Sequence, residues 1–156
     1  MRKTFGTGSV WEQKVGYSRA VQVDNTLYIS ATAASGEDGV VGADFYTQTR
    51  YILDKLGTVL ADAGFDYADV VQSKLYLTDI SQWEEAGRAH GEVFGEIRPS
   101  LALVHVLPFL DPKMLVEIEL DEEQSVAVLG EPQLDVPEPV GEGERELLRG
   151  RRAGLA

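Results

Sequence analysis

The sequence contains no cysteine, which excludes disulfides, thiolate nucleophiles and cysteine-based metal sites. Basic side chains are also few, because 14 Lys and Arg stand against 26 Asp and Glu for a formal net charge of -12. A surface of that charge repels phosphate backbones and anionic lipid headgroups. We therefore expect neither nucleic acid nor a membrane as a partner.

Long hydrophobic runs are missing as well. No stretch approaches the roughly 20 apolar residues that span a bilayer, and no apolar run follows Arg2 and Lys3 as it would in a secretory signal. A cytoplasmic location is the expectation. The chain does have 44% hydrophobic and 26% charged residues over 156 positions, which is typical of one globular domain with an appendage.

The first half of the chain predicts a hairpin, a loop and a helix. Two β-rich runs, residues 20–23 and 27–30, flank the turn residues Asp24-Asn25, as in a β-hairpin. The small, Gly-rich segment 31–42 predicts a loop with room for a short hairpin. Apolar residues spaced three, four and seven apart then predict a helix over residues 44–63, which Gly64 ends.

The second half predicts a strand, a helix and two strands. Apolar and polar side chains alternate over residues 71–78, as in a strand with a core face and a polar face. Ser81 and Glu84 match a capping box that begins a helix over residues 82–94. Its apolar stripe is expected to comprise Trp83, Ala86, His90, Val93 and Phe94. Pro99 precedes a predicted strand over residues 101–107, and Pro108 and Pro112 bracket a turn before a predicted strand over residues 114–120.

This order of elements favours a sheet with both helices on one face. The face without helices is expected to carry an apolar and acidic mixture: Leu101, Leu103 and Tyr76 beside Glu117 and Glu119. Such a mixture is better explained by burial against other subunits, with a cleft at the seam, than by exposure to water.

The tail from residue 121 onward is rich in Glu, Pro and Gly and ends in LLRGRR at residues 147–152. One interpretation is an extension that is disordered or lies on the surface. The other is a short helix over residues 144–152 that docks on a neighbouring subunit or another protein.

Four segments, in order, resemble the Rid (reactive intermediate deaminase, or YjgF) family. They are GYSRAV at residues 16–21, LYISA at 27–31, the strand 70–79 ending in YLTD, and VEIE at 116–119. The resemblance implies an α+β, chorismate-mutase-like domain over residues 1–120, with two helices on one face of the sheet. It also implies a homotrimer with a central barrel and ligand clefts between subunits.

The resemblance further implies hydrolysis of an enamine or imine to a keto acid and ammonia, with no metal or organic cofactor. Such a reaction requires an anchor for the substrate carboxylate, a positioned water and a group that moves protons. The family anchor is an arginine in a Pro-x-Arg pattern, where this chain has Pro99-Ser100-Leu101. An aliphatic side chain cannot make the bidentate contact of a guanidinium with a carboxylate, so we expect a substrate of another class.

The remaining site candidates follow from the same resemblance and from strand parity. Glu117 is the candidate catalytic residue, with an ordinary polar-face carboxylate as the alternative. Tyr17, Ser30 and Ala31 would shape the pocket, and Leu101 with Leu103 and His105 would line it, although an interface role for His105 is also open. Arg19 and Lys74 are candidates for a displaced anchor, unless each is simply a surface charge.

Two functions remain open at this point. The first is a Rid-like enzyme acting on a reactive metabolite that is uncharged or less acidic. The second is a non-catalytic trimer that binds a small ligand, or a protein through its tail. Loss of the arginine favours the second, whereas retention of Glu117 and Tyr17 favours the first.

Overall fold

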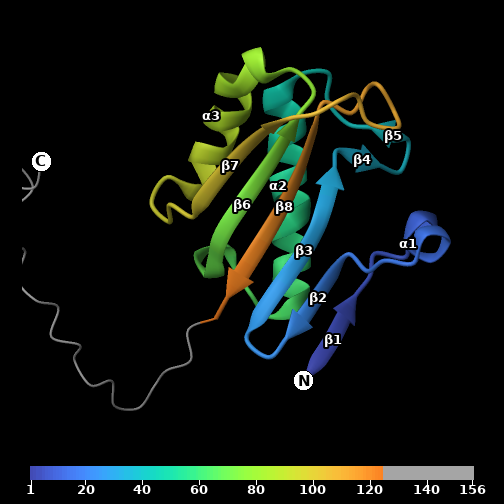
Figure 1. Ribbon diagram of the computed structural model, residues 1–156, viewed down its shortest axis with the longest axis vertical. Coiled ribbons are helices and arrows are strands. Elements are labelled where there is room, and N and C mark those ends of the chain that lie inside the picture. The colour runs from blue at the N-terminus through green and yellow to red at the C-terminus, as the bar shows by residue number, and fades with distance from the viewer. Residues whose placement is uncertain (125–156) are drawn as a thin grey trace, which may run out of the picture. The chain divides into compact units, whose positions relative to one another are not determined.

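The computed structural model describes residues 1–124, which form one mixed sheet with three helices (Figure 1). The six-stranded sheet has the order β1-β2-β3-β8-β6-β7. Neighbouring strands are antiparallel except β6 and β7, which run parallel. The strands are β1 Arg2–Phe5, β2 Ala20–Val23, β3 Thr26–Ala33, β6 Val70–Leu77, β7 Ser100–His105 and β8 Val116–Glu123. A separate hairpin pairs β4 Ser35–Gly36 with β5 Gly39–Val40.

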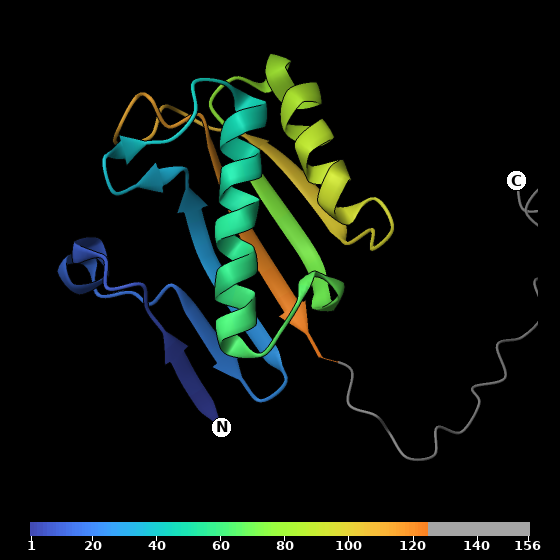
Figure 2. The same cartoon turned by 180° about the vertical axis from the view of Figure 1, so that it is seen from behind.

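The two long helices, α2 Phe45–Ala63 and α3 Trp83–Phe94, cover one face of the sheet, as expected (Figure 2). Helix α2 begins where predicted because the Asp44 carboxylate accepts a hydrogen bond from the Thr47 amide, 2.7 Å away. It ends at Gly64 in the left-handed conformation. The sequence did not predict β1 or the six-residue helix α1 Val10–Val15.

The predicted start of the second helix is wrong in its detail. A 3-10 turn, Ile80–Gln82, precedes α3, and the carboxylate of Asp79 accepts from both the amide and the hydroxyl of Ser81. Ser81 therefore caps nothing, and the N-cap residue Gln82 makes no side-chain cap. Trp83 is also 50% exposed rather than part of the buried stripe, which consists of Ala86, Ala89, His90 and Phe94.

The core fills the space between the sheet and the two helices. Fully buried side chains include Leu27, Ile29, Ile52, Leu56, Leu60, Leu75, Ile118 and Leu120. Burial of each such side chain stabilises the fold by about 1.5–3 kcal/mol before chain entropy is subtracted. The helices therefore stay fixed on this face, which leaves the opposite face without cover from the described residues.

Strand β6 alternates as predicted from Ser73 onward but not at its start. A bulge between Val70 and Gln72 shifts the register against β8, so Val70 is buried while Val71 is 48% exposed. Ser73, Leu75 and Leu77 face the helices, and Lys74 and Tyr76 face the open side of the sheet.

The predicted orientation of β7 is wrong. Leu101 is paired with Ser73 and Leu103 with Leu75, and paired residues on neighbouring strands point to the same side of a sheet. Leu101 and Leu103 therefore lie on the helix face, and Ala102 and Val104 take the open face. The bend at residues 95–99 sets this parity, and sequence alternation inside the strand cannot reveal it.

One chain forms an open sheet, so the predicted barrel would require further copies. Strand β8 continues to Glu123, three residues past the predicted domain boundary. The predicted extension, and its helix over residues 144–152, lie outside the described residues. Within residues 1–124 no helix is both long and apolar enough to cross a membrane.

Candidate functional site

A bulge in β3 organises the candidate site. The pairing of β3 with β8 shifts register between Ile29 and Thr32, which leaves Ser30 and Ala31 out of the regular ladder. The Ser30 amide donates to the carbonyl of Arg19 at 2.9 Å, and its hydroxyl donates to the carbonyl of Ser18, also at 2.9 Å. The bulge is therefore held against the start of β2.

Arg19 fills this bulge. Its Nη1 lies 3.3 Å from the Ser30 carbonyl oxygen, 3.0 Å from that of Ala31 and 2.7 Å from the Thr32 hydroxyl. Its Nη2 donates to the Tyr17 hydroxyl at 3.0 Å. The residue is only 9% exposed. Arg19 is thus neither a surface charge nor a free substrate anchor, because its guanidinium already binds groups of its own chain.

Glu117 lies on β8 between Ala33 of β3 and Tyr76 of β6. It faces the open side of the sheet and is half-buried. Burial raises the pKa of its carboxyl, and the positive charge of Arg19 offsets part of that rise. A carboxyl group with a raised pKa can give and take protons closer to neutral pH than an ordinary glutamate.

Glu119, two residues along the same strand, has the opposite environment. Lys74 Nζ lies 2.6 Å from one of its oxygens, and the Tyr76 hydroxyl donates to the other at 2.9 Å. Burial opposes ionisation, but these two hydrogen bonds and the Lys74 charge prevail and lower the pKa of Glu119. Lys74 also contacts Asp121 at 3.5 Å. Glu119 therefore stays ionised in an ion-pair cluster, and Glu117 is the better candidate for proton transfer.

The three candidates on β7 do not lie beside Glu117 in the fold. Leu101 is 48% exposed at the sheet edge, and Leu103 packs partly against the core. His105 is exposed, with Nε2 3.2 Å from the carbonyl oxygen of Thr78. One protomer brings Tyr17, Arg19, Ser30 and Ala31 together with Glu117 nearby, and it places Leu101, Leu103 and His105 on the other face.

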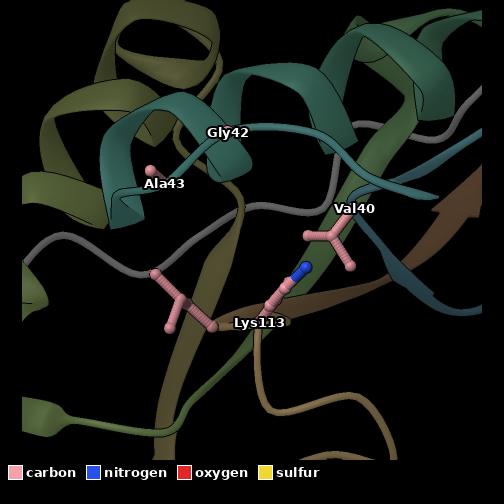
Figure 3. A pocket seen from close by; sticks show the side chains of 5 residues that line it. Val40, Gly42, Ala43 and Lys113 are labelled. Atoms are coloured by element: carbon pink, nitrogen blue, oxygen red, sulfur yellow. The ribbon is translucent and has the colours of Figure 1, made fainter. Parts of the chain in front are cut away.

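A pocket of about 240 Å³ that the sequence did not reveal lies beside the start of β8 (Figure 3). Val40, Gly42, Ala43, Lys113 and Leu115 line it, with the Lys113 ammonium directed toward Val40. Buried Gln48 joins the two segments that line the pocket. Its Nε2 donates to the Gly42 and Lys113 carbonyls, and its Oε1 accepts from the Leu115 amide. The signal in the sequence was one polar residue on the apolar face of the first predicted helix.

Within residues 1–124, no three His, Asp or Glu side chains lie close enough together to hold a metal ion.

Comparison with known proteins gives consistent results. Residues 9–123 match a protein-family model described as Endoribonuclease L-PSP. A 3-aminoacrylate deaminase RutC of Acinetobacter baylyi is 31% identical over 104 residues, which cover 65% of this chain and 82% of that protein. A 2-iminobutanoate/2-iminopropanoate deaminase of Bos taurus is 29% identical over 110 residues, covering 68% and 79%.

Among solved structures, Rv2704 of Mycobacterium tuberculosis is described as a member of the YjgF/YER057c/UK114 family. It is 39% identical, with a TM-score of 0.73, and the match covers 80% of this chain and all of that one.

Proposed function

Since the chain belongs to the Rid (YjgF) family, we propose that it hydrolyses an enamine, imine or related reactive metabolite in the cytoplasm. Relatives named as deaminases, at about 30% identity, support this reaction type. The net charge of -12 supports a small molecule over RNA as the substrate, because an anionic surface repels the phosphate backbone.

The observation that carries the proposal is the half-buried Glu117 carboxyl group beside the bulge that Arg19 fills. In the reaction, a proton moves from the nitrogen of an enamine to its carbon to give the imine, and water then adds to the imine carbon. Glu117 accepts a proton from that water and returns it to nitrogen, which gives a carbinolamine. The hydroxyl proton of the carbinolamine then moves through Glu117 to nitrogen as the carbon–nitrogen bond breaks, and ammonia and a carbonyl compound leave.

The site would lie between subunits of a homotrimer. The open face bears a half-buried ion-pair cluster around Lys74 and Glu119 together with exposed Tyr28 and Val104, a mixture that supports contact with another copy. Leu101, Leu103 and His105 lie on the far face of their own protomer. They can line the same cleft as Glu117 only if they come from a neighbouring subunit.

The substrate class follows from Leu101. In our proposal this residue replaces the arginine that binds a substrate carboxylate, and Arg19 is not free to take its place. An unpaired carboxylate against a leucine would lose its hydration without compensation. The preferred substrate is therefore an imine or enamine without an α-carboxylate, with Tyr17, Ser30 and Ala31 shaping the rest of the pocket.

The alternative is a trimer that binds a ligand or partner without catalysis. The contacts of Arg19 within its own chain favour this alternative, because they leave no free cation beside Glu117 to bind a charged substrate. The two functions predict different results for a substitution of Glu117: only an enzyme would lose its rate of imine hydrolysis.

The test follows carbonyl product and ammonia release from imines that an amine oxidase or an amino-acid oxidase generates in place. We expect the wild type to accelerate release from imines without a carboxylate, Glu117→Gln to lose that acceleration, and the exposed control Glu96→Gln to keep it. Leu101→Arg should shift the preference toward imines of amino acids. A wild type that accelerates neither class would leave the non-catalytic alternative.

A further inference from the structure

We propose that Arg19 is a positioning residue: it fixes the β3 bulge and the Tyr17 hydroxyl around the site without touching the substrate. The expected effects on kinetics rest on the proposed function. The expected effects on the bulge and on Glu117 rest only on the observed contacts of Arg19. It assigns to Arg19 a role different from that of a displaced carboxylate anchor.

The backbone of the bulge brings two carbonyl oxygens together, and their negative partial charges favour a cation between them. Successive carbonyl groups of a regular strand point to opposite sides, yet the carbonyl oxygens of Ser30 and Ala31 both lie within 3.3 Å of Arg19 Nη1. The Thr32 hydroxyl lies 2.7 Å from the same nitrogen and also donates to the Ser30 carbonyl at 2.8 Å. Converging carbonyl dipoles repel each other, and the guanidinium between them offsets that repulsion.

The other edge of the guanidinium sets the position of Tyr17. Nη2 donates to the Tyr17 hydroxyl at 3.0 Å, and the guanidinium carbon lies 5.4 Å from the centre of the ring. Tyr17 lies between α1 and β2 and belongs to neither. This contact is therefore what we expect to hold the Tyr17 hydroxyl beside the guanidinium that fills the bulge.

The charges around Arg19 come from three elements. Glu12 of α1 lies 3.9 Å from Nε, and the Thr7 amide and hydroxyl bind its carboxylate. Burial raises the pKa of Glu117 on β8, and the positive charge of Arg19 lowers it in part. Lys55 of α2 donates to the Ser35 carbonyl at 2.8 Å, and its pKa is lowered by burial and by Arg19. Removal of the Arg19 charge should therefore raise the pKa of Glu117 further.

Only arginine combines both effects. A lysine supplies the charge as a point, without the planar fork that reaches two carbonyls and a hydroxyl on one side and a phenol on the other. A glutamine supplies hydrogen bonds without charge. The two substitutions therefore separate the geometric contribution from the electrostatic one.

The kinetic test compares wild type, Arg19→Lys and Arg19→Gln on the imine substrates above. We expect kcat to fall at least tenfold in both variants with KM changed less than threefold. The pH-rate limb assigned to Glu117 should move to higher pH in Arg19→Gln and stay near its wild-type position in Arg19→Lys. A rise in KM with kcat unchanged, in either variant, would show that Arg19 binds substrate and would overturn the inference.

A second measurement does not need activity, so it separates this inference from the proposed function. Carbon-13 NMR follows the titration of Glu117, and hydrogen exchange follows the amides of residues 30–32, in the same variants. Arg19→Gln should raise the pKa of Glu117 and speed exchange at the bulge, whereas the surface control Arg50→Gln, which loses contacts with Asp54 and Glu92, should do neither. Should Arg19→Gln not fold, Thr32→Val removes one contact and must still speed exchange at the bulge. An unchanged bulge and an unchanged Glu117 titration would overturn the inference.

Discussion

Glu122 lies directly opposite Leu27 across the β3–β8 pair, and its carboxyl group is held inside the core. The residue is 0% exposed, and neither carboxyl oxygen has a hydrogen-bond partner among the described residues. Burial raises its pKa to about 8, with further contributions from the negative charges of Asp121 and Asp69. At neutral pH the side chain is therefore mostly a neutral acid.

This burial predicts that the domain loses stability between mildly acidic and neutral pH. The pKa of Glu122 in the fold, about 8, exceeds its ordinary 4.5, so the contribution is full below pH 4.5, falls steadily as pH rises from 4.5, and is gone once pH has passed 8. At about 1.4 kcal/mol per pKa unit, the loss is roughly 5 kcal/mol at most. Urea unfolding at pH 5 and pH 9 measures it. Glu122→Gln should remove most of the difference, and an equal difference in the variant would contradict the assignment.

Two helical glycines should respond in opposite directions to alanine. A Cβ at Gly57 of α2 would lie 2.5 Å from the Tyr67 hydroxyl oxygen, which donates to the Leu53 carbonyl at 2.6 Å. A Cβ at Gly91 of α3 would meet nothing within 4 Å. We expect Gly91→Ala to stabilise by up to about 1 kcal/mol and Gly57→Ala to lower the melting temperature. A stabilised Gly57→Ala would show that Tyr67 moves aside freely.

Periodicity was sufficient to predict the two long helices and most of the sheet. Helix α2 occupies Phe45–Ala63 against a predicted 44–63, and the central strands carry their apolar residues on the helix face. These elements are fixed by burial of a repeated apolar stripe, which a sequence displays directly. The cap of α3 was missed because Asp79 competes for the Ser81 amide and hydroxyl that the predicted box assigned to the helix.

The candidate site was less predictable because it depends on bulges and on strand parity. The bulge between Ile29 and Thr32 turns Ser30 and Ala31 toward Arg19, and no local signal in the sequence marks it. The parity of β7 is set by the chain reversal before Ser100, so Leu101 takes the face opposite to the one expected. Which residues form the sheet was therefore easier to predict than which side chains share a face.

The buried pair Ser73 and His90 predicts a second pH effect, on the acid side. Ser73 Oγ lies 2.9 Å from His90 Nε2 inside the core, and burial lowers the pKa of the imidazole. Stability from neutral His90 is present above its ordinary pKa, about 6.5, and falls as pH drops below that value. Ser73→Ala should leave a buried nitrogen without a partner and lower stability by about 1–3 kcal/mol. Chemical denaturation at pH 7 measures the loss, and a change under 0.5 kcal/mol would indicate that the hydrogen bond contributes little.

The cluster of Lys74, Glu119 and Asp121 on the open face predicts how association responds to mutation. Lys74 lies 2.6 Å from one carboxylate and 3.5 Å from the other, and burial of the face by neighbouring copies would remove water from all three charges. Lys74→Ala would then leave two carboxylates without their cation in an interface, which is strongly unfavourable. We expect sedimentation velocity to show wild type at three times the 17.1 kDa chain mass and Lys74→Ala with a dissociation constant raised at least tenfold. The control Arg88→Ala breaks a pair with Glu85 at 2.9 Å whose members are both about half exposed, and such surface pairs contribute about 0–1 kcal/mol. It should therefore leave the assembly intact, and equal behaviour of the two variants would show that the open face is not the interface.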